Sequence, residues 1–406
     1  MKHAPAVGAG ALLLCLTFPF APGSTTPELA ADFDWMWDTL RTQLFDSTLV
    51  DRFFTETHRR ALAECARAAS SPDELARAVN SLLDSLNLSH NRVFTESDAE
   101  YYMFRSMFES RDIATPKVHH LGIQCLPTDP SVLRAVWDGY PAARAGLRRG
   151  DVILAADGRP FHPLNSFRAG GPATLTVRRQ QDTLEVRVDP VCEGINASLL
   201  QAMRNSARHL TLAERPVGYL HLWSGTCPEI LREFTRLVTE DFRDVDGILL
   251  DLRDGWGGAW YDYLDPFFED RRDFYVSTAL RRDRRTIGRP DPVGPHAWFR
   301  GPLVVLINEG TRSGKEAMAF QFKKSKRAVL VGSTTAGAFT GGSNAFRAGF
   351  VLFYPYNGPI LLDDQRLEGV GVAPDVRVDD PVERPGKGDP QLERGIEEMR
   401  TLLDRY

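Results

Sequence analysis

The sequence predicts an α/β fold joined to a helical region and a β-rich domain, on three observations. Short apolar runs such as Leu303–Ile307 are too short for helices and rich enough in branched residues for buried strands. Helical patterns such as residues 228–242 alternate with these runs in the second half of the chain. Residues 118–190 show strand-like alternation, and residues 27–87 show helical periodicity. We therefore expect an α/β core towards the C-terminus, preceded by two differently built parts.

Length and charge exclude several classes of protein. The chain has 406 residues, enough for two or three domains and a sizeable core. Its formal net charge is −5, with acidic and basic residues nearly balanced, so nothing indicates a nucleic-acid partner or an anionic membrane surface. No CxxC or histidine-rich spacing indicates a metal site, and we expect neither a metal nor a cofactor.

Residues 1–23 are typical of a secretory signal. Lys2 provides a basic start, residues 7–18 form an apolar run, and Ala21-Pro22-Gly23 offers small residues for cleavage. The run is too short to span a bilayer, and no later stretch is long and apolar enough to do so. We expect a periplasmic or secreted protein with no stable membrane span after signal removal.

The N-terminal region, residues 24–115, is predicted to be helical. Between residues 33 and 44, apolar residues recur at helical spacing, and Ser71-Pro72-Asp73-Glu74 is typical of a helix start. The polar loop that follows contains Ser89-His90. A lone histidine in such a loop is most often a surface residue, so this pattern alone assigns it no role.

The cysteines leave two alternatives open. After signal removal Cys65, Cys125, Cys192 and Cys227 remain, and export permits disulfides. Cys125 and Cys192 bracket the β-rich segment, which makes their pairing plausible. Buried thiols are equally compatible with the sequence.

The β-rich segment, residues 116–192, resembles a PDZ domain. Residues 141–147, Gly150–Leu154 and Asp157-Gly158 carry the pattern, and His120-Leu121-Gly122-Ile123 stands where that family has its carboxylate-binding loop. The resemblance implies that a peptide C-terminus adds as an extra strand while backbone N–H groups hold its carboxylate. The alternative is a PDZ fold kept as a rigid spacer or as a lid over a catalytic groove.

The second half reads as alternating strands and helices. A strand at residues 247–253 runs into a loop with Gly255, Gly257 and Gly258; glycines there allow close approach of backbone to a ligand, although a plain turn is the alternative. Residues 281–295 are charged and Pro-rich, which indicates a surface excursion. Asn357-Gly358 is expected to be a hairpin turn, and residues 391–403 a final helix.

Ser313 lies where a predicted strand turns sharply into a helix. The strand is Leu303–Ile307, and the helical pattern runs from Ser313 to Lys326. A serine at such a turn exposes its hydroxyl beside free N–H groups of the helix end, the geometry that acyl transfer needs. The alternative is an ordinary N-cap serine.

The order of these pieces resembles the C-terminal processing, or tail-specific, serine peptidases of family S41. The strand ending in Asp251-Leu252-Arg253, the serine three residues before Glu316, and residues 371–375 (GVAPD) appear in the family's order. The resemblance implies a ClpP/crotonase-like catalytic core at residues 193–406, with the helical region before it and an inserted PDZ-like domain. It also implies that Ser313 is the nucleophile.

The resemblance points to the lysine-free, tricorn-like branch. Ala338 stands where other members carry the lysine base, and Lys315 lies about 200° around the helix from Ser313. The resemblance then implies His90 as base, with Ser89 and Glu368 supporting it. The oxyanion donors would be the N–H of Gly314 and one from Gly257 or Gly258.

The implied function is an exported serine endopeptidase, assisted by its PDZ domain, that cleaves polypeptides near a free C-terminus. A histidine base of ordinary pKa, about 6.5, would make activity rise towards neutral pH. Two alternatives remain: a catalytically inactive relative that binds peptides, and an apolar-ligand carrier of the same fold.

Overall fold

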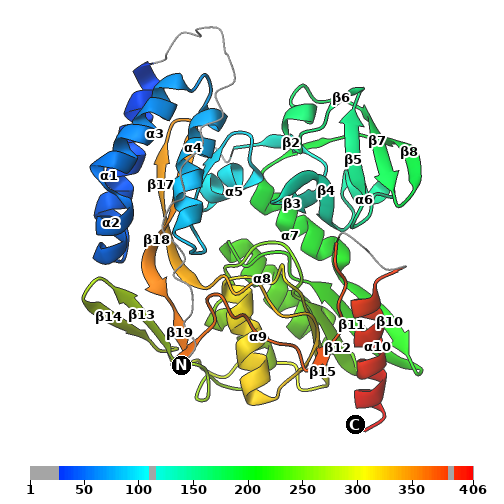
Figure 1. The fold of residues 1–406 in the computed structure, drawn as a ribbon. Coiled ribbons are helices and arrows are strands. Elements are labelled where there is room, and N and C mark those ends of the chain that lie inside the picture. Colours follow the sequence, from blue (N-terminus) through cyan, green and yellow to red (C-terminus); the bar gives the residue numbers. More distant parts are fainter. Residues whose placement is uncertain (1–26, 109–115, 383–387, 406) are drawn as a thin grey trace, which may run out of the picture.

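The computed structural model describes residues 27–108, 116–382 and 388–405 (Figure 1). The predicted signal at residues 1–23 lies outside these ranges. In the described part of the chain, no helix combines the length and the apolar character needed to cross a membrane.

A six-stranded sheet forms the centre of the C-terminal half. Its order is β10-β11-β12-β15-β16-β21, with β10 antiparallel to β11 and the other neighbours parallel. The strands are β10 (Arg208–Leu212), β11 (Arg215–His221), β12 (Gly247–Asp251), β15 (Leu303–Ile307), β16 (Val329–Gly332) and β21 (Val376–Arg377). The parallel strands β12 and β15 are buried throughout, which is why they read as continuous apolar runs rather than alternating ones.

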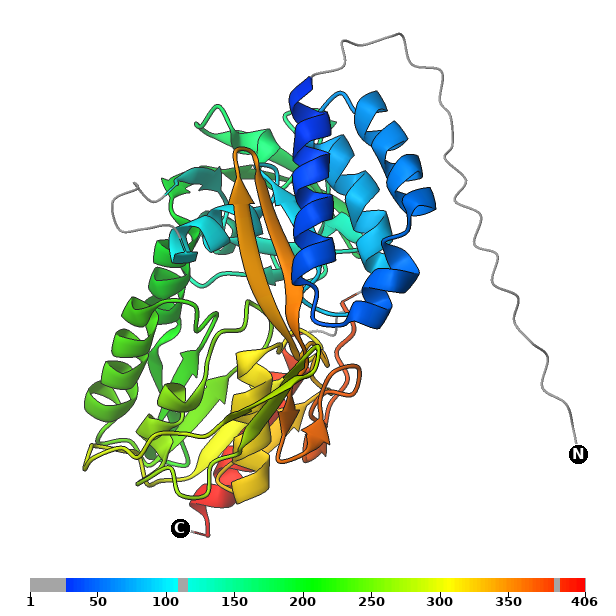
Figure 2. The same cartoon turned by 90° about the vertical axis from the view of Figure 1, so that its left-hand side faces the viewer.

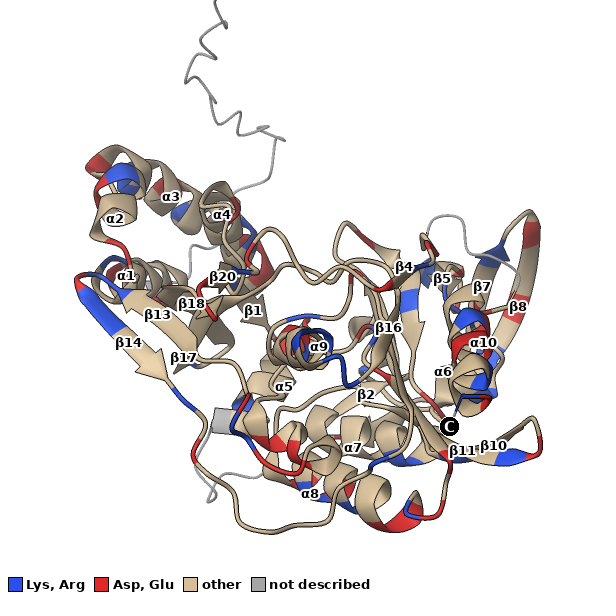
Figure 3. Ribbon diagram, turned by 90° about the horizontal axis from the view of Figure 1, so that it is seen from below, with Lys and Arg blue, Asp and Glu red and all other residues tan. Residues whose placement is uncertain are grey.

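Helices cover both faces of this sheet. Leu250 and Val305 pack into the larger core together with α7, α8 and α9, whereas Leu249 and Val304 pack against α10. The larger core also takes in short helical turns of the connecting segments. These helical elements are α7 (Ile195–Ser206), α8 (Pro228–Arg236), the π-helical turn η2 (Leu237–Asp241), η3 (Tyr261–Tyr263), η4 (Asp265–Phe267), α9 (Gly314–Ser325) and α10 (Pro390–Leu403). Figure 3 shows acidic and basic residues interspersed along α8 and α10, in keeping with the near-balanced charge.

A second, three-stranded sheet joins the N-terminal helices to this core. It consists of β1 (Arg92–Thr95), β18 (Phe350–Pro359) and β17 (Thr340–Arg347), in that order. Leu352 and Tyr354 pack towards the helices, while Val351 and Phe353 pack towards the core. The helices are α1 (Pro27–Gln43), α2 (Ser47–Phe53), α3 (Glu56–Ala68) and α4 (Pro72–Ser85), and the β17–β18 hairpin runs alongside them (Figure 2). Because β1 begins two residues after His90, this sheet places the His90 ring against Phe353, which packs on the larger core.

The expected hairpin turn at Asn357-Gly358 is wrong. Strand β18 continues through both residues, and the hairpin turns instead at residues 348–349, where Gly349 has a φ of +76°. A Cβ on Gly358 would lie 2.9 Å from the ring of Phe45. The glycine therefore makes room for a packed aromatic ring, a tertiary requirement that looks like turn chemistry in the sequence.

Two segments contain regular structure that the sequence patterns do not indicate. The charged excursion at residues 281–295 includes β14 (Arg284–Gly288), which pairs with β13 (Ser277–Arg281). Strand β13 pairs in turn with the short hairpin of β19 (Leu361–Leu362) and β20 (Gln365–Arg366). Helix α5 (Ala99–Phe108) lies inside the predicted helical region of residues 24–115, but beyond residues 27–87, which alone show helical periodicity.

The β-rich domain has its own small core. Its strands are β3 (Ile123–Leu126), β4 (Asp129–Val136), β5 (Val152–Ala156), β6 (Arg159–Pro160), β7 (Ala173–Arg179) and β8 (Asp182–Val188), with α6 (Pro141–Arg144) and η1 (Asn165–Phe167). Its two connections, β2 (Val118–His120) and β9 (Val191–Glu193), pair with each other. The domain therefore enters and leaves the chain at one place, as an insertion does.

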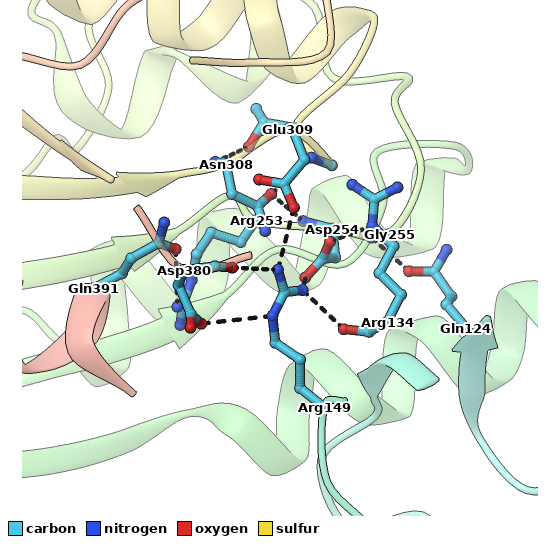
Figure 4. Close-up of polar contacts among 12 residues, drawn as sticks. Gln124, Arg134, Arg149, Arg253, Asp254, Gly255, Asn308, Glu309, Asp380 and Gln391 are labelled. Carbon is cyan, nitrogen blue, oxygen red and sulfur yellow. Dashed lines mark hydrogen bonds and ion pairs between the residues drawn. The ribbon is translucent and has the colours of Figure 1, made fainter. Parts of the chain in front are cut away.

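Charged side chains join the β-rich domain to the central sheet (Figure 4). Arg134 Nε lies 2.7 Å from Asp254 Oδ1, and Arg149 reaches Asp254 Oδ2 at 3.3 Å and Glu309 Oε1 at 3.1 Å. Gln124 Oε1 accepts the N–H of Gly255 at 2.7 Å. The inserted domain thus contacts the glycine loop that follows β12.

The plausible disulfide between Cys125 and Cys192 is absent, and both residues are thiols. Cys192 is exposed on β9. On β3, burial raises the pKa of Cys125 to about 12, so its reactive thiolate form is suppressed at neutral pH.

Candidate active site

Ser313 lies on the sharp turn between β15 and α9, with a φ of 54° and a ψ of −129°. A non-glycine residue rarely adopts this conformation, and such strain concentrates at functional sites. Its Oγ lies 3.1 Å from the Nε2 atom of His90, 223 residues away in the sequence. His90 also has a positive φ of 56°. Both members of the contact are therefore held in strained backbone conformations.

Glu316 anchors the turn that carries Ser313. Its buried carboxylate accepts the N–H of Ser313 at 2.9 Å, the hydroxyl of Thr335 at 2.6 Å, and the N–H groups of Gly337 and Ala338 at 2.7 and 2.9 Å. Burial raises the pKa of this carboxyl, and the four hydrogen bonds act in the opposite direction. At Ala338, where a lysine base would stand, the backbone is thus part of the support of the nucleophile turn.

Ser89, His90 and Glu368 form a hydrogen-bonded chain that ends at Ser313. Glu368 Oε2 accepts the hydroxyl of Ser89 at 2.8 Å, and Ser89 Oγ lies 2.8 Å from His90 Nδ1. Since Ser89 has one hydroxyl proton and donates it to Glu368, its oxygen accepts the Nδ1–H of His90. This network assigns the proton to Nδ1 and leaves the Nε2 lone pair facing the hydroxyl of Ser313.

The environment of His90 favours the neutral imidazole. Burial, and secondarily the nearby Arg312 guanidinium, lower the pKa of His90 to about 3. The ring of Phe353 packs edge-on at 5.1 Å and contributes to this desolvation. A neutral imidazole with its free lone pair on a serine hydroxyl is competent to accept that proton over a wide pH range.

The glycine loop after β12 lies directly against Ser313. A Cβ on Gly257 would lie 2.5 Å from Ser313 Cβ and 3.1 Å from its Oγ, so only glycine fits. Within the described residues, the N–H groups of Gly257, Gly258 and Gly314 have no hydrogen-bond partner. Gly257 and Gly258 line the same cavity as Ser313, and Gly314 follows it in the chain, so the three predicted oxyanion donors lie near the serine with their N–H groups available to a ligand.

One cavity of about 950 Å³ connects this cluster with the β-rich domain. Its lining includes His90 and Ser313, the strand β3, and a largely apolar wall. Apolar wall residues include Phe104, Trp137, Trp256, Trp260, Phe339 and Phe353. A strand of the PDZ-like domain and the serine therefore face the same space.

Charged residues that the sequence did not predict also line this cavity, Arg312 and Glu100 among them. Arg312, immediately before Ser313, lines it, and so does Glu100, whose pKa is raised by burial and by Asp98. The position of Arg312 beside the nucleophile was a usable signal. Glu100 lies on α5, beyond the helical periodicity of residues 27–87, so no periodic pattern pointed to it.

The predicted peptide-binding loop is only partly open to the cavity. His120 and Ile123 line it, but Leu121 is buried in the core of the β-rich domain. The N–H of Gly122 donates to His120 Nδ1 at 3.1 Å, and His120 Nε2 lies 3.1 Å from Ser198 Oγ. One N–H of the predicted carboxylate-binding loop is thus already bonded to a buried imidazole. Burial lowers the pKa of that imidazole, His120, to about 4.

Comparison with family models finds two matches. Residues 216–378 match peptidase family S41, and residues 132–179 match the PDZ domain. The first match includes nearly all of β11, the strands β12 and β15, the glycine loop and Ser313.

The curated relatives that match carry the names of C-terminal processing peptidases and of tricorn proteases. A carboxy-terminal-processing protease of Bartonella bacilliformis is 25% identical, over 78% of this chain and 73% of the relative. The chloroplastic C-terminal processing peptidase of Tetradesmus obliquus is 28% identical over 59% of this chain, but the match spans 55% of that relative. The tricorn protease of Thermoplasma volcanium is 30% identical over 47% of this chain and 18% of its own length.

Solved structures support the fold. A photosystem II D1 C-terminal processing protease matches with a TM-score of 0.55 at 18% identity, covering 88% of this chain and 95% of the other. A tricorn protease structure matches at 0.52 and 17% identity, covering 93% of this chain and 37% of the other. The predicted α/β fold with an inserted PDZ-like domain is therefore confirmed.

Proposed function

The chain carries a peptidase domain of family S41 and a PDZ domain, and from this premise we propose that it is a serine endopeptidase cleaving polypeptides near their C-terminus. In this proposal Ser313 is the nucleophile and His90 is the general base. The observation that carries it is the hydrogen-bonded chain from Glu368 through Ser89 and His90 to Ser313 Oγ.

The reaction follows from the direction of these hydrogen bonds. His90 Nε2 takes the hydroxyl proton as Ser313 Oγ attacks the scissile carbonyl carbon, whose oxygen becomes an oxyanion. The N–H of Gly314 and one from Gly257 or Gly258 stabilise that charge. His90 then gives the proton to the leaving amine, the C–N bond breaks, and an acyl ester remains on Ser313.

A water molecule completes the cycle. His90 removes its proton as its oxygen attacks the ester, and returns the proton to Ser313 Oγ when the ester bond breaks. Throughout, Ser89 accepts Nδ1–H, and Glu368 supports the positive charge that the imidazole carries transiently. The carboxylate acts through the serine hydroxyl rather than on the ring directly.

A serine-directed fluorophosphonate tests this proposal. We expect one equivalent of label, and peptide mapping should find it on the peptide containing Ser313. The inactive relative and the apolar-ligand carrier would not react. If the protein takes up no label and also hydrolyses no peptide, the peptidase proposal is contradicted.

We further propose that the PDZ-like domain binds the substrate C-terminus in the cavity that it shares with Ser313. Strand β3 lines that cavity and would pair with an extended peptide. The relatives' names describe C-terminal or carboxy-terminal processing, which accords with this substrate class. We also propose export to the periplasm or secretion, on the signal-like residues 1–23.

Affinity for paired peptides tests the substrate proposal. A peptide with a free C-terminal carboxylate is expected to bind several-fold more tightly than the same peptide amidated, because an amide lacks the charge that backbone N–H groups favour. Calorimetry on the Ser313→Ala protein avoids cleavage during the measurement. Equal affinities for the two forms would favour the spacer or lid alternative.

A further inference from the structure

Lys315 is a buried cation beside the site to which no role has been given so far. It is the second residue of α9, and its side chain is fully buried. Its Nζ donates to the backbone carbonyl of Leu222 at 3.2 Å and to that of Asp254. Leu222 directly follows β11, and Asp254 belongs to the glycine loop after β12. The ammonium group therefore connects the helix of Ser313 to two adjacent strand ends.

The contact with Asp254 sets the orientation of the first peptide of the glycine loop. In a trans peptide the C=O and the next N–H point in opposite directions. With the Asp254 carbonyl directed to Lys315, the N–H of Gly255 points away and donates to Gln124. A Cβ on Gly255 would lie 1.9 Å from the carbonyl oxygen of Trp223, so the loop is already packed against that segment.

The segment after β11 holds the rest of the glycine loop. Trp256 N donates to the Trp223 carbonyl at 2.8 Å, and Gly225 N donates to the Gly257 carbonyl at 2.9 Å. These bonds fix the loop to the segment after β11, whereas Lys315 fixes it to the helix that begins beside Ser313. The distance between Ser313 and the N–H groups of Gly257 and Gly258 depends on both attachments.

We propose that Lys315 is a positioning residue that ties the nucleophile's helix to the glycine loop and so sets the oxyanion-binding geometry. This inference rests on the proposed function. Lys315 does not act as base here, because its Nζ is engaged by two carbonyls and Ser313 Oγ is contacted by His90. A charged group is costly to bury, and here the two carbonyls that Nζ binds offset that cost and are thereby held in place relative to α9.

The protonation state of Lys315 supplies a readout. Burial lowers its pKa to about 7; the facing carboxylates of Asp254 and Asp251 oppose this, and Arg134 and Arg312 add to it. Below about pH 7 the group is an ammonium with three donors, and above it a neutral amine with weaker ones. The tether therefore weakens as pH rises, so kcat is expected to fall above about pH 7. A general base would give the opposite slope.

The Lys315→Met variant tests the inference, with Lys324→Met, an exposed lysine on the same helix, as matched control. Loss of one oxyanion donor typically costs about 10²–10³-fold in kcat, and we expect Lys315→Met to lose up to that factor with KM changed less than about threefold. A peptide boronate, which forms a tetrahedral adduct on the serine, should lose affinity in parallel with kcat. Rates are normalised to the folded fraction by thermal unfolding. Lys324→Met should match the parent.

Three outcomes would overturn the inference. They are a Lys315→Met enzyme with normal kcat and boronate affinity, a loss confined to KM, and a parent enzyme whose kcat does not decline above pH 7. The pH dependence of kcat in the parent enzyme needs no variant, so it tests the inference even if Lys315→Met does not fold. If Ser313→Ala retains full activity in the same assay, the proposed function fails instead, and the two failures are distinguishable.

Discussion

Replacing Ser313 by alanine is expected to abolish peptide hydrolysis while leaving the fold intact. Removal of the nucleophile from a triad-type site costs about 10⁶-fold in kcat, and no other hydroxyl in this site is placed against an imidazole nitrogen and the glycine N–H groups in the same way. The substitution removes one oxygen and adds no atoms, so the close approach of Gly257 is preserved. Steady-state hydrolysis of a peptide substrate measures the effect.

A matched control is available on the same helix. Ser325→Ala changes an exposed serine at the far end of α9 and should leave kcat within about twofold of the parent. Circular dichroism should give the same spectrum for all three proteins. Undiminished hydrolysis by Ser313→Ala would reject Ser313 as the nucleophile.

Replacing His90 by alanine is expected to lower kcat/KM by about 10²–10⁴-fold or more, the usual contribution of a general base. Glu368→Gln should give a smaller but substantial loss, because Glu368 accepts both N–H and O–H of Ser89 and a single amide oxygen cannot replace both carboxylate oxygens. His58→Ala, in an exposed position on α3, is the matched control. A His90→Ala enzyme with near-normal turnover would contradict the assignment.

The pH profile of the parent enzyme gives an independent check on His90. The base acts in its neutral form, and a pKa lowered to about 3 keeps it neutral throughout the mildly acidic range. The acid limb of kcat/KM, which reports the free enzyme, should therefore lie well below pH 6.5. Because the cation of Arg312 contributes to the lowering, Arg312→Met should move the limb upwards. A limb near 6.5 in the parent would contradict the buried environment.

The difference from the sequence expectation has a physical cause. The residue type alone gives an imidazole pKa of about 6.5 and hence a limb near neutrality. Burial beside Phe353 and the charge of Arg312 displace that value, and both neighbours reach His90 only in the folded chain. A titration value depends on the surroundings of a group, which residue spacing does not describe.

Local sequence patterns predicted much of the fold. The strand Leu303–Ile307 has the predicted bounds because five consecutive apolar residues are buried on both faces of a parallel sheet. The final helix, expected at residues 391–403, spans Pro390–Leu403, since its apolar periodicity matches the face that it buries. The prediction of a turn at Asn357-Gly358 was wrong because the sequence does not distinguish a glycine that makes room for the ring of Phe45 from a glycine in a turn.

Part of the candidate site could likewise be predicted from short stretches of sequence, and part could not. The turn at Ser313 with Glu316 three residues later, and the glycines after β12, could be identified from short stretches, because strand ends and helix starts are encoded by neighbouring residues. The resemblance also named Ser89, His90 and Glu368. Their hydrogen-bonded order, with Ser89 between the carboxylate and the ring, appears only in three dimensions.

The sequence by itself therefore determined the elements, their order and the residue types available for acyl-transfer chemistry, since these depend on contacts between near neighbours. Tertiary structure alone decided which nitrogen of His90 faces Ser313, how far its pKa is lowered, and that Lys315 binds two strand-end carbonyls. Each of these depends on groups brought together from distant parts of the chain. The packing of the three-stranded sheet, the inserted domain and the turn before α9 around one cavity supplies that proximity.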